Sequence, residues 1–250
     1  MSVWQSVAPF VVGHRGGRGE GWPPENTLEA FERARQQGAR AVELDVRTSA
    51  EGEAVVFHDP TMTRMTSGRD SRRVVDIPLG QLRAVDLGAG SRIPTLVDVL
   101  AWARSPGIGV NVEVKYDVPN RTDVVRAAAR AMRQCDTDVL ISSFDPFMLA
   151  AVAALAPAVP RALLTHAGQP RWAGAVQALL RPPLVSAMHL ERTQVGSGSI
   201  AGKYRALRIG IWTVNSQLEA VDFVRRGAAW IISDMAGDVV EALRGGCAPV

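Results

Sequence analysis

The pattern that determines the predicted fold begins with Phe10-Val11-Val12-Gly13-His14-Arg15-Gly16-Gly17. Phe10–Gly13 is a short apolar run, typical of a buried strand, and a histidine and an arginine follow it. Asn26–Gln37 then carries apolar residues at helical spacing and is closed by Gly38. Ala41–Asp45 is a second apolar run. Strand, helix and strand in this order predict one unit of a parallel β-sheet.

The same alternation continues along the chain. Further predicted strands are Ala54–His58, Gly109–Lys115, Val139–Phe144, Ala162–Thr165, Leu184–Met188, Ile209–Val214 and Trp230–Ser233. Further predicted helices are Thr122–Arg133, Pro146–Leu155 and Ser216–Arg226. The strand runs are apolar on both faces, as expected for parallel strands covered by helices. About eight β/α units in 250 residues predict an α/β protein of the TIM (β/α)8-barrel type, folded as one domain over residues 1–250.

An open, doubly wound sheet is the alternative architecture. Its dinucleotide-binding form is disfavoured because no GxGxxG motif follows a strand in this sequence. Residues 60–93 interrupt the alternation: they are rich in Arg, Ser and Gly and too long for an ordinary βα loop. We therefore predict a small insertion on the barrel next to His58, with a disordered surface loop as the other interpretation.

Composition narrows the class of protein. Hydrophobic residues make up 47% and charged residues 21%, as in ordinary soluble globular proteins. The net charge is +3, and no Lys/Arg run predicts binding to nucleic acid. Neither a signal peptide nor a long apolar segment is visible, so we expect no stable membrane insertion. The two cysteines, Cys135 and Cys247, form no CxxC pair, which favours a reducing compartment and a cytoplasmic location. The sequence makes no prediction of oligomeric state.

Several predicted strands end in polar side chains, and in a (β/α)8 barrel such ends meet at the active-site face. The side chains are His14 and Arg15, Glu43 and Asp45, His58 and Asp59, Glu113 and Lys115, and Trp212 with Asn215. Residues two apart on a strand point to the same face, so Glu43 and Asp45 lie together. With Glu113 they would form an oxygen-rich site for a hard divalent cation, Mg²⁺ or Ca²⁺. The other interpretation is a salt bridge between a carboxylate and an arginine.

The remaining residues suit chemistry on an anion. His14 and His58 can transfer protons near neutral pH. Arg15 and Lys115 can bind phosphate oxygens, although Arg15 can equally pair with Glu25. Trp212 can provide an apolar wall or belong to the core. The chain has four histidines, and for His166 and His189 we favour a structural role because neither has a matching acid pattern.

Six sequence blocks resemble the signature of the glycerophosphodiester phosphodiesterase family, and they occur in the family's order. The blocks are His14-Arg15-Gly16, Pro24-Glu25-Asn26-Thr27, Glu43-Leu44-Asp45-Val46, His58-Asp59, Glu113-Val114-Lys115 and Trp212-Thr213-Val214-Asn215. The resemblance covers residues 13–234 and implies a (β/α)8 barrel with a small insertion after the His58 block. The last strand departs from the family pattern: Ser233-Asp234-Met235-Ala236 keeps the acid but lacks the usual proline.

Carried onto this chain, the resemblance implies a role for each residue. It implies metal ligands at Glu43, Asp45 and Glu113 and an acid/base pair at His14 and His58. It implies phosphate contacts from Arg15 and Lys115, an orienting acid at Glu25 and an aromatic contact to glycerol at Trp212.

The activity it implies is metal-dependent hydrolysis of a glycerophosphodiester to sn-glycerol 3-phosphate and an alcohol. His14 is favoured as base and His58 as acid; the attacking group is water or a neighbouring hydroxyl of the glycerol. Neither the head group nor the choice between Mg²⁺ and Ca²⁺ is predicted.

Two other functions remain open at this point. The same residues suit a lysophospholipase D-type reaction on a lipid, for which the insertion would supply an apolar rim through Met62, Met65, Val74 and Val75. A catalytically silent barrel that binds phosphorylated ligands is the third hypothesis. It is disfavoured because all the histidines and acids are present.

Overall fold

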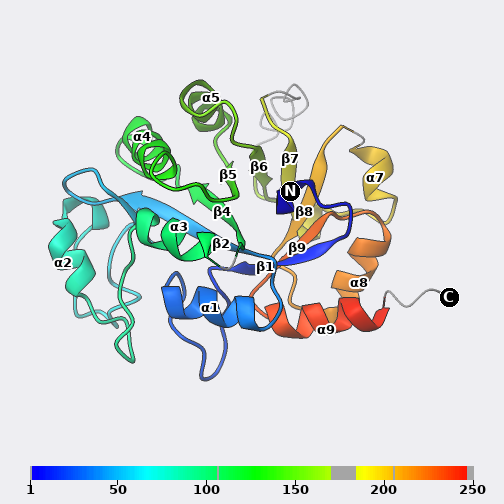
Figure 1. Ribbon diagram of the computed structural model, residues 1–250, viewed down its shortest axis with the longest axis horizontal. Coiled ribbons are helices and arrows are strands. Elements are labelled where there is room, and N and C mark those ends of the chain that lie inside the picture. Colours follow the sequence, from blue (N-terminus) through cyan, green and yellow to red (C-terminus); the bar gives the residue numbers. More distant parts are fainter. Residues whose placement is uncertain (1, 106, 170–183, 205, 247–250) are drawn as a thin grey trace.

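The computed structural model describes residues 2–105, 107–169, 184–204 and 206–246, and its centre is a barrel of parallel strands (Figure 1). The barrel strands are β1 (Phe10–His14), β2 (Ala41–Thr48), β4 (Gly109–Val114), β5 (Val139–Ser143), β6 (Arg161–Thr165), β7 (Ala187–Glu191), β8 (Arg208–Trp212) and β9 (Trp230–Ser233). They pair in the order β1-β9-β8-β7-β6-β5-β4-β2, and β1 also pairs with β2. This last pairing closes the barrel, so the predicted TIM barrel is confirmed and the open sheet is wrong.

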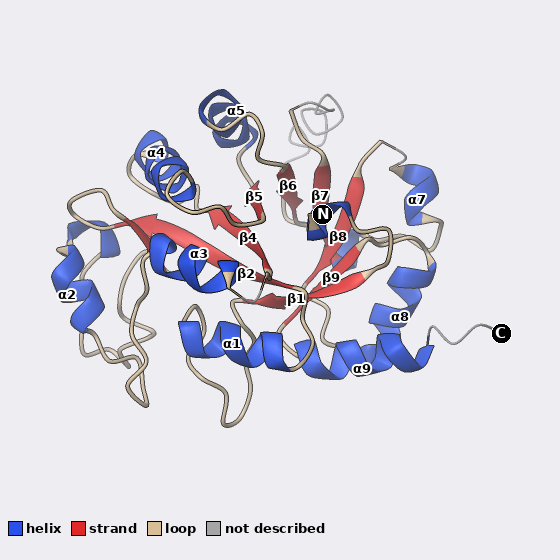
Figure 2. Cartoon of the chain, viewed as in Figure 1, coloured by secondary structure: helices blue, strands red, loops and turns tan. Residues whose placement is uncertain are grey.

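Helices surround the barrel (Figure 2). They are α1 (Leu28–Gln36), α3 (Leu96–Arg104), α4 (Arg121–Met132), α5 (Pro146–Leu155), α7 (Ile200–Lys203), α8 (Gln217–Arg225) and α9 (Ala236–Gly246). The predicted helices coincide with α1, α4, α5 and α8. A polar side chain caps the first turn of each of these four, as the hydroxyl of Thr27 does by accepting from the Ala30 N–H. Helices α3, α7 and α9 were not predicted.

Alternate residues of each strand face the inside of the barrel, where the amino-terminal half is apolar. A short 3₁₀ helix, Val3–Gln5, places Trp4 against this interior. The Trp4 ring lies edge-on to Phe10 and Trp230, with centroid distances of 5.8 and 5.5 Å. A side chain at Gly210 would collide with the Trp230 ring, which explains the glycine in that strand. Because aromatic side chains fill the amino-terminal half of the barrel, the polar side chains of the site lie at the carboxyl ends of the strands.

One predicted strand has a different role from the one we expected. The run Ala54–His58 contains β3 (Ala54–Val56), which pairs antiparallel with β2 and extends the sheet beyond the barrel. The reason is the short turn at residues 49–53, because a parallel connection needs a crossover of a dozen or more residues. A smaller shift occurs at β7, which begins at Ala187 rather than at Leu184.

The insertion is folded around a small core of its own, so the interpretation as a disordered loop is wrong. It contains a 3₁₀ turn, Val74–Asp76, and α2 (Leu79–Ala84). Its buried cluster consists of Val55, Phe57, Met62, Val74, Ile77, Leu82 and Ile93. The predicted apolar rim is therefore wrong for Met62 and Val74, which are 0% and 1% exposed. Their burial stabilises the insertion and leaves neither side chain available to a lipid.

Within the described residues, every helix is too short or too polar to cross a lipid bilayer.

Candidate active site

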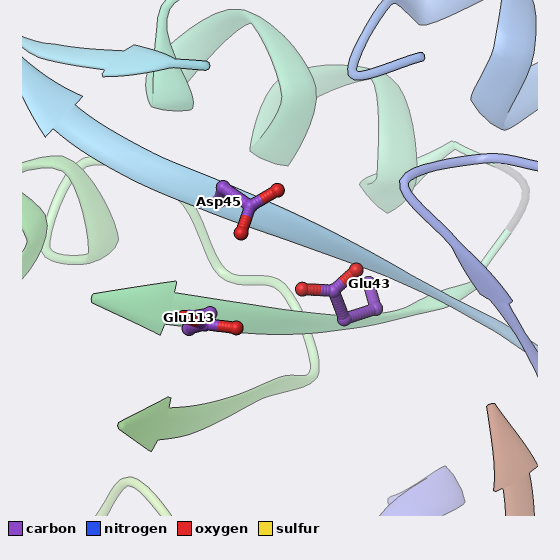
Figure 3. Close-up of side chains that lie close together, drawn as sticks. All are labelled: Glu43, Asp45 and Glu113. Carbon is purple, nitrogen blue, oxygen red and sulfur yellow. The ribbon is translucent and has the colours of Figure 1, made fainter. Parts of the chain in front are cut away.

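Three carboxylates from neighbouring strands form the centre of the site (Figure 3). Glu43 and Asp45 lie on β2 and Glu113 lies on β4, where it is the register partner of Asp45. One oxygen from each lies within 4.8 Å of the other two, and all three residues are buried. Opposite ligands of a cation with metal–oxygen distances of about 2.4 Å are separated by about 4.8 Å. The spacing therefore allows one divalent cation to contact all three carboxylates, and the all-oxygen donor set suits either Mg²⁺ or Ca²⁺.

Two basic side chains lie against this triplet. The Nζ of Lys115 is 2.8 Å from Glu113 Oε1 and 3.2 Å from Asp45 Oδ1. Burial acts to lower the pKa of Lys115, but these two carboxylates outweigh it and raise that pKa above its usual value. The Nε of Arg15 is 3.1 Å from Asp45 Oδ2, and the Arg15 backbone N–H donates to Glu43 at 3.0 Å. Two positive charges therefore face three acids.

Glu43 is costly to ionise in this cluster. Burial raises its pKa well above the usual value, and the neighbouring carboxylates of Asp45 and Glu113 raise it further. A buried carboxylate that is costly to ionise next to two others is relieved when a cation binds. The electrostatics of the triplet therefore agree with its spacing, and both fit a divalent cation.

Asn26 fixes the position of Asp45. Its side-chain N–H donates to Asp45 Oδ2 at 2.9 Å, and its Oδ1 accepts from the Asp45 backbone N–H at 3.3 Å. The Asn26 backbone N–H donates to the carbonyl of Arg15 at 2.9 Å. Both Arg15 and Asn26 have positive φ, 51° and 60°, a conformation that is uncommon outside glycine. The turn after β1 thus brings the basic residue and the amide to the same carboxylate.

Each predicted catalytic histidine is bound to an aspartate through Nδ1. His14 Nδ1 lies 2.7 Å from Asp234 Oδ1, and His58 Nδ1 lies 2.6 Å from Asp59 Oδ1. Burial acts to raise the pKa of both aspartates, but hydrogen bonds from the histidines and from arginines lower it. An ionised carboxylate only accepts, so we assign the proton to Nδ1 and leave Nε2 as an acceptor in the neutral ring. Burial lowers the pKa of His58.

The site opens into a cavity of about 190 Å³. It is lined by His14, Arg15, Glu43, His58, Asn111, Glu113, Lys115, Phe144, Leu164, Trp212 and Ile232. Of the predicted site residues, Asp45 and Glu25 lie behind this lining: Asp45 binds Lys115, and Glu25 accepts from Arg15 Nη1 at 3.0 Å. Acidic and basic groups thus form one side of the cavity, and aromatic and aliphatic groups form the other.

Trp212 lines the apolar side of the cavity. Its indole N–H donates to the carbonyl of His189 at 3.2 Å, and its ring lies edge-on to Phe144 at 5.7 Å. His189 is fully buried and accepts from the indole N–H of Trp230, which agrees with the structural role favoured for it. His166 lies edge-on to Phe144, at a centroid distance of 5.5 Å.

Four residues of the cavity wall were not predicted from the sequence as site residues: Asn111, Phe144, Leu164 and Ile232. Asn111 is 1% exposed, and its Oδ1 has no hydrogen-bond partner in the part of the chain that the structure describes. Strand alternation would have identified it, because it lies two residues before Glu113 and shares its face. Phe144 lies just past the end of β5 and could have been found in the same way. We noted Asp234 and Asp59 in the sequence without assigning them to the histidines.

Comparisons with known proteins show which family the chain belongs to. The model of the glycerophosphoryl diester phosphodiesterase family matches residues 14–238. The chain belongs to this family. It is therefore similar to phosphoric diester hydrolases over nearly its whole length, which confirms the resemblance and the enzyme class predicted from the six motifs.

Individual family members show how far the similarity extends. A glycerophosphodiester phosphodiesterase of Caldanaerobacter subterraneus subsp. tengcongensis is 30% identical, over 95% of this chain and 98% of the relative. Among solved structures, an Oleispira antarctica phosphodiesterase in complex with the product sn-glycerol-3-phosphate is 27% identical. It covers 94% of this chain and 97% of its own, with a TM-score of 0.83. The glycerophosphodiester phosphodiesterase of Agrobacterium tumefaciens is 26% identical, covers 94% and 100%, and has a TM-score of 0.74.

Proposed function

We propose that this protein hydrolyses glycerophosphodiesters to sn-glycerol 3-phosphate and an alcohol. The observation that carries the proposal is the meeting, in one cavity, of the acidic triplet and two histidines that are each bound to an aspartate. The Oleispira relative supports the product, since its structure contains sn-glycerol-3-phosphate. Family membership supports the reaction class.

The substrate phosphate is bound on the charged side of the cavity. Glu43, Asp45 and Glu113 would hold Mg²⁺ or Ca²⁺, which when bound neutralises phosphate charge. Arg15 offers a planar fork and Lys115 a point charge to the phosphate oxygens. Glu25 orients Arg15 by accepting from its Nη1.

The glyceryl group is bound on the other side of the cavity. Trp212 and Phe144 cover its carbon chain, because both rings line the cavity there. The Oδ1 of Asn111, which has no hydrogen-bond partner among the described residues, accepts from one of the glyceryl hydroxyl groups, since a buried acceptor is costly to leave without a donor.

The two histidines transfer the protons. His14 acts as base on the attacking oxygen, since its Nε2 lies deep in the site, 3.9 Å from Glu43 Oε2. Attack by water gives sn-glycerol 3-phosphate directly. Attack by the neighbouring glycerol hydroxyl expels the alcohol and gives a cyclic phosphate, which a water molecule then opens to sn-glycerol 3-phosphate. His58 protonates the leaving alcohol, because its side chain is 31% exposed and lies where that alcohol departs into solvent. The Nδ1–aspartate bonds orient both rings toward the cavity.

A screen of glycerophosphodiesters tests this proposal. Glycerophosphocholine, glycerophosphoethanolamine and glycerophosphoglycerol are incubated with the protein, and released sn-glycerol 3-phosphate is measured. EDTA abolishes the release, and adding back Mg²⁺ or Ca²⁺ restores it. Full activity after rigorous removal of metal contradicts the role given to the acidic triplet.

The histidine roles have their own test. His14→Ala and His58→Ala each lower turnover by about 10²–10⁴-fold, the usual contribution of general acid–base catalysis. Circular dichroism and the melting temperature show that the fold persists. Near-normal activity of His14→Ala would contradict the assignment of His14 as the catalytic base.

A lysophospholipase D-type activity keeps some structural support despite the burial of Met62 and Val74. Three other large apolar side chains, Tyr116, Phe147 and Met235, are at least partly exposed, at 39%, 75% and 37%. They follow the carboxyl ends of β4, β5 and β9, where the cavity opens. Comparing the rates on glycerophosphocholine and lysophosphatidylcholine decides between the two substrates. Absence of release from every diester, with and without metal, favours the silent binding barrel instead.

A further inference from the structure

Behind each catalytic histidine, the aspartate is held at two points by an arginine. Arg18 donates from Nε to Asp234 Oδ1 at 3.0 Å and from Nη2 to Oδ2 at 2.8 Å. Arg64, in the insertion, donates from Nε to Asp59 Oδ2 at 2.6 Å and from Nη2 to Oδ1 at 3.2 Å. A bidentate pair of this kind fixes the plane of the carboxylate as well as its place. Two Arg–Asp–His relays therefore flank the cavity, and neither arginine was predicted from the sequence as a site residue.

The two relays meet at one buried carboxylate. Arg64 Nη2 donates to Glu25 Oε1 at 2.7 Å, and Arg18 Nη1 lies 3.9 Å from Glu25 Oε2. Glu25 is 7% exposed, whereas both arginine side chains are 48% exposed. The guanidinium groups thus lie between solvent and the site and are joined through an acid that also binds Arg15. The insertion is connected to the barrel at this point.

We propose that Arg18 and Arg64 are positioning residues, each holding the aspartate that orients one catalytic histidine. The inference rests on the proposed function for its effect on turnover. An aspartate fixed at both oxygens presents one lone-pair direction to the Nδ1–H of the histidine. The imidazole then keeps its Nε2 toward the cavity instead of sampling other orientations. A loosened carboxylate leaves the fold intact and lowers the fraction of correctly oriented histidine.

Ordinary surface ion pairs in the same insertion provide the contrast. Arg72 also binds an aspartate at two points, donating from Nη2 to Asp70 Oδ2 at 2.7 Å and from Nε to Oδ1 at 3.1 Å. Its other side-chain bond is to Gln81, also in the insertion. Exposed pairs of this kind contribute little to stability. Arg72→Met is therefore a matched control for Arg64→Met. Both arginines lie in the insertion and bind an aspartate at two points, but the aspartate bound by Arg72 holds no catalytic histidine.

The first experiment measures kinetics on the diester that the wild type hydrolyses best. Arg64→Met and Arg18→Met lower kcat about 10- to 100-fold and change KM less than about threefold, because alignment of a proton-transfer group acts mainly on the transition state. Arg72→Met behaves as the wild type. In an Asp59→Asn background, Arg64→Met lowers kcat less than about twofold further, because the relay is already broken. Guanidinium ion added to Arg64→Met recovers part of the lost turnover.

The second experiment requires no turnover. The chain has four histidines, so ¹⁵N spectra of the imidazoles resolve each ring. In the wild type His58 is the Nδ1–H tautomer, and in Arg64→Met its signals move toward a mixture of tautomers while those of Arg72→Met do not. An unchanged tautomer together with kcat equal to that of Arg72→Met overturns the proposal, as does a full additional loss in the Asp59→Asn background. Wild-type protein that cleaves no diester would overturn the proposed function alone, and the tautomer result would still decide on the relay.

Discussion

The ammonium nitrogen of Lys115, which follows the last residue of β4, lies 2.8 Å from Oε1 of Glu113, two residues earlier in the chain. A lysine and the predicted cation therefore share one carboxylate. Like charges at such a distance repel, and the repulsion is strong in a buried site. If the triplet holds a cation, as we propose, Lys115 should weaken its binding, and the lysine charge would be available to the substrate phosphate.

Substitution of Lys115 separates these two effects. In Lys115→Met the divalent cation binds as tightly as in the wild type or several-fold more tightly, because a competing charge is gone. Turnover falls by about 10²-fold or more, since the phosphate loses a charge-assisted contact. Isothermal titration with Ca²⁺ or Mg²⁺ and a diesterase assay measure the two quantities. A variant with weaker cation binding would show that Lys115 helps to assemble the triplet.

Binding of the cation should stabilise the fold. A ligand that binds only the folded state adds about 2.7 kcal/mol at 100 times its Kd. We expect Mg²⁺ or Ca²⁺ to raise the melting temperature of the wild type, and to do so much less for Glu113→Gln, which loses a charged ligand. Arg72→Met, a surface variant, is the control: the same salt should raise its melting temperature as much as that of the wild type. If the cation raised the melting temperatures of the wild type and of Glu113→Gln equally, the acidic triplet would not be its binding site.

His189 should make the fold sensitive to acid. Burial lowers the pKa of His189 to about 3, from 6.5 in the unfolded chain. As the pH falls, the unfolded state therefore takes up a proton before the folded state does. The stability that the neutral, buried imidazole contributes is fully present above pH 6.5 and is lost as the pH falls toward 3. At pH 5 this loss amounts to about 2 kcal/mol. Urea unfolding at pH 7 and pH 5 measures it, with His189→Gln as the variant whose pH dependence is smaller. Identical pH dependence in both proteins would contradict the burial of a neutral imidazole.

Met62 tests the small core of the insertion. Met62→Ala removes a fully buried side chain and should lower the free energy of unfolding by about 2–5 kcal/mol, or melt the insertion on its own. Because the insertion carries Arg64, we expect kcat to fall as well. The ratio of activity on lysophospholipid to that on glycerophosphocholine should stay constant, as Met62 does not face the substrate. A selective loss of lysophospholipid cleavage would show instead that Met62 belongs to an apolar rim that contacts the lipid.

Local patterns predicted most of the barrel. Apolar runs and helix signals are properties of neighbouring residues, and α5 was found at its observed bounds, Pro146–Leu155. The proximity of the acidic triplet could also be predicted, because two of its acids are two residues apart on one strand. The direction of β3 was missed because we applied the parallel rule without considering the length of the turn before it. Helix α3 was missed although Thr95 and Asp98 form a capping box at its start.

The second layer of the site could not be predicted in the same way. Asp234 holds His14 across 220 residues of sequence, and no spacing rule connects positions so distant. Arg64 was one of many arginines in a segment without clear periodicity. Its role depends on the folded insertion, which places its guanidinium between Asp59 and Glu25. Pairwise contacts of this type follow from the closed barrel and not from local sequence.

The pairing of β1 with both β2 and β9 has a consequence for how the enzyme matures. His14 comes from the first strand and its aspartate from just beyond the last, so a chain emerging from the ribosome holds an incomplete site until its final segment has docked. During refolding, helical signal and burial of tryptophan should return before diester cleavage does. Recovery of diester cleavage would then report the pairing of β1 with β9, which brings Asp234 to His14.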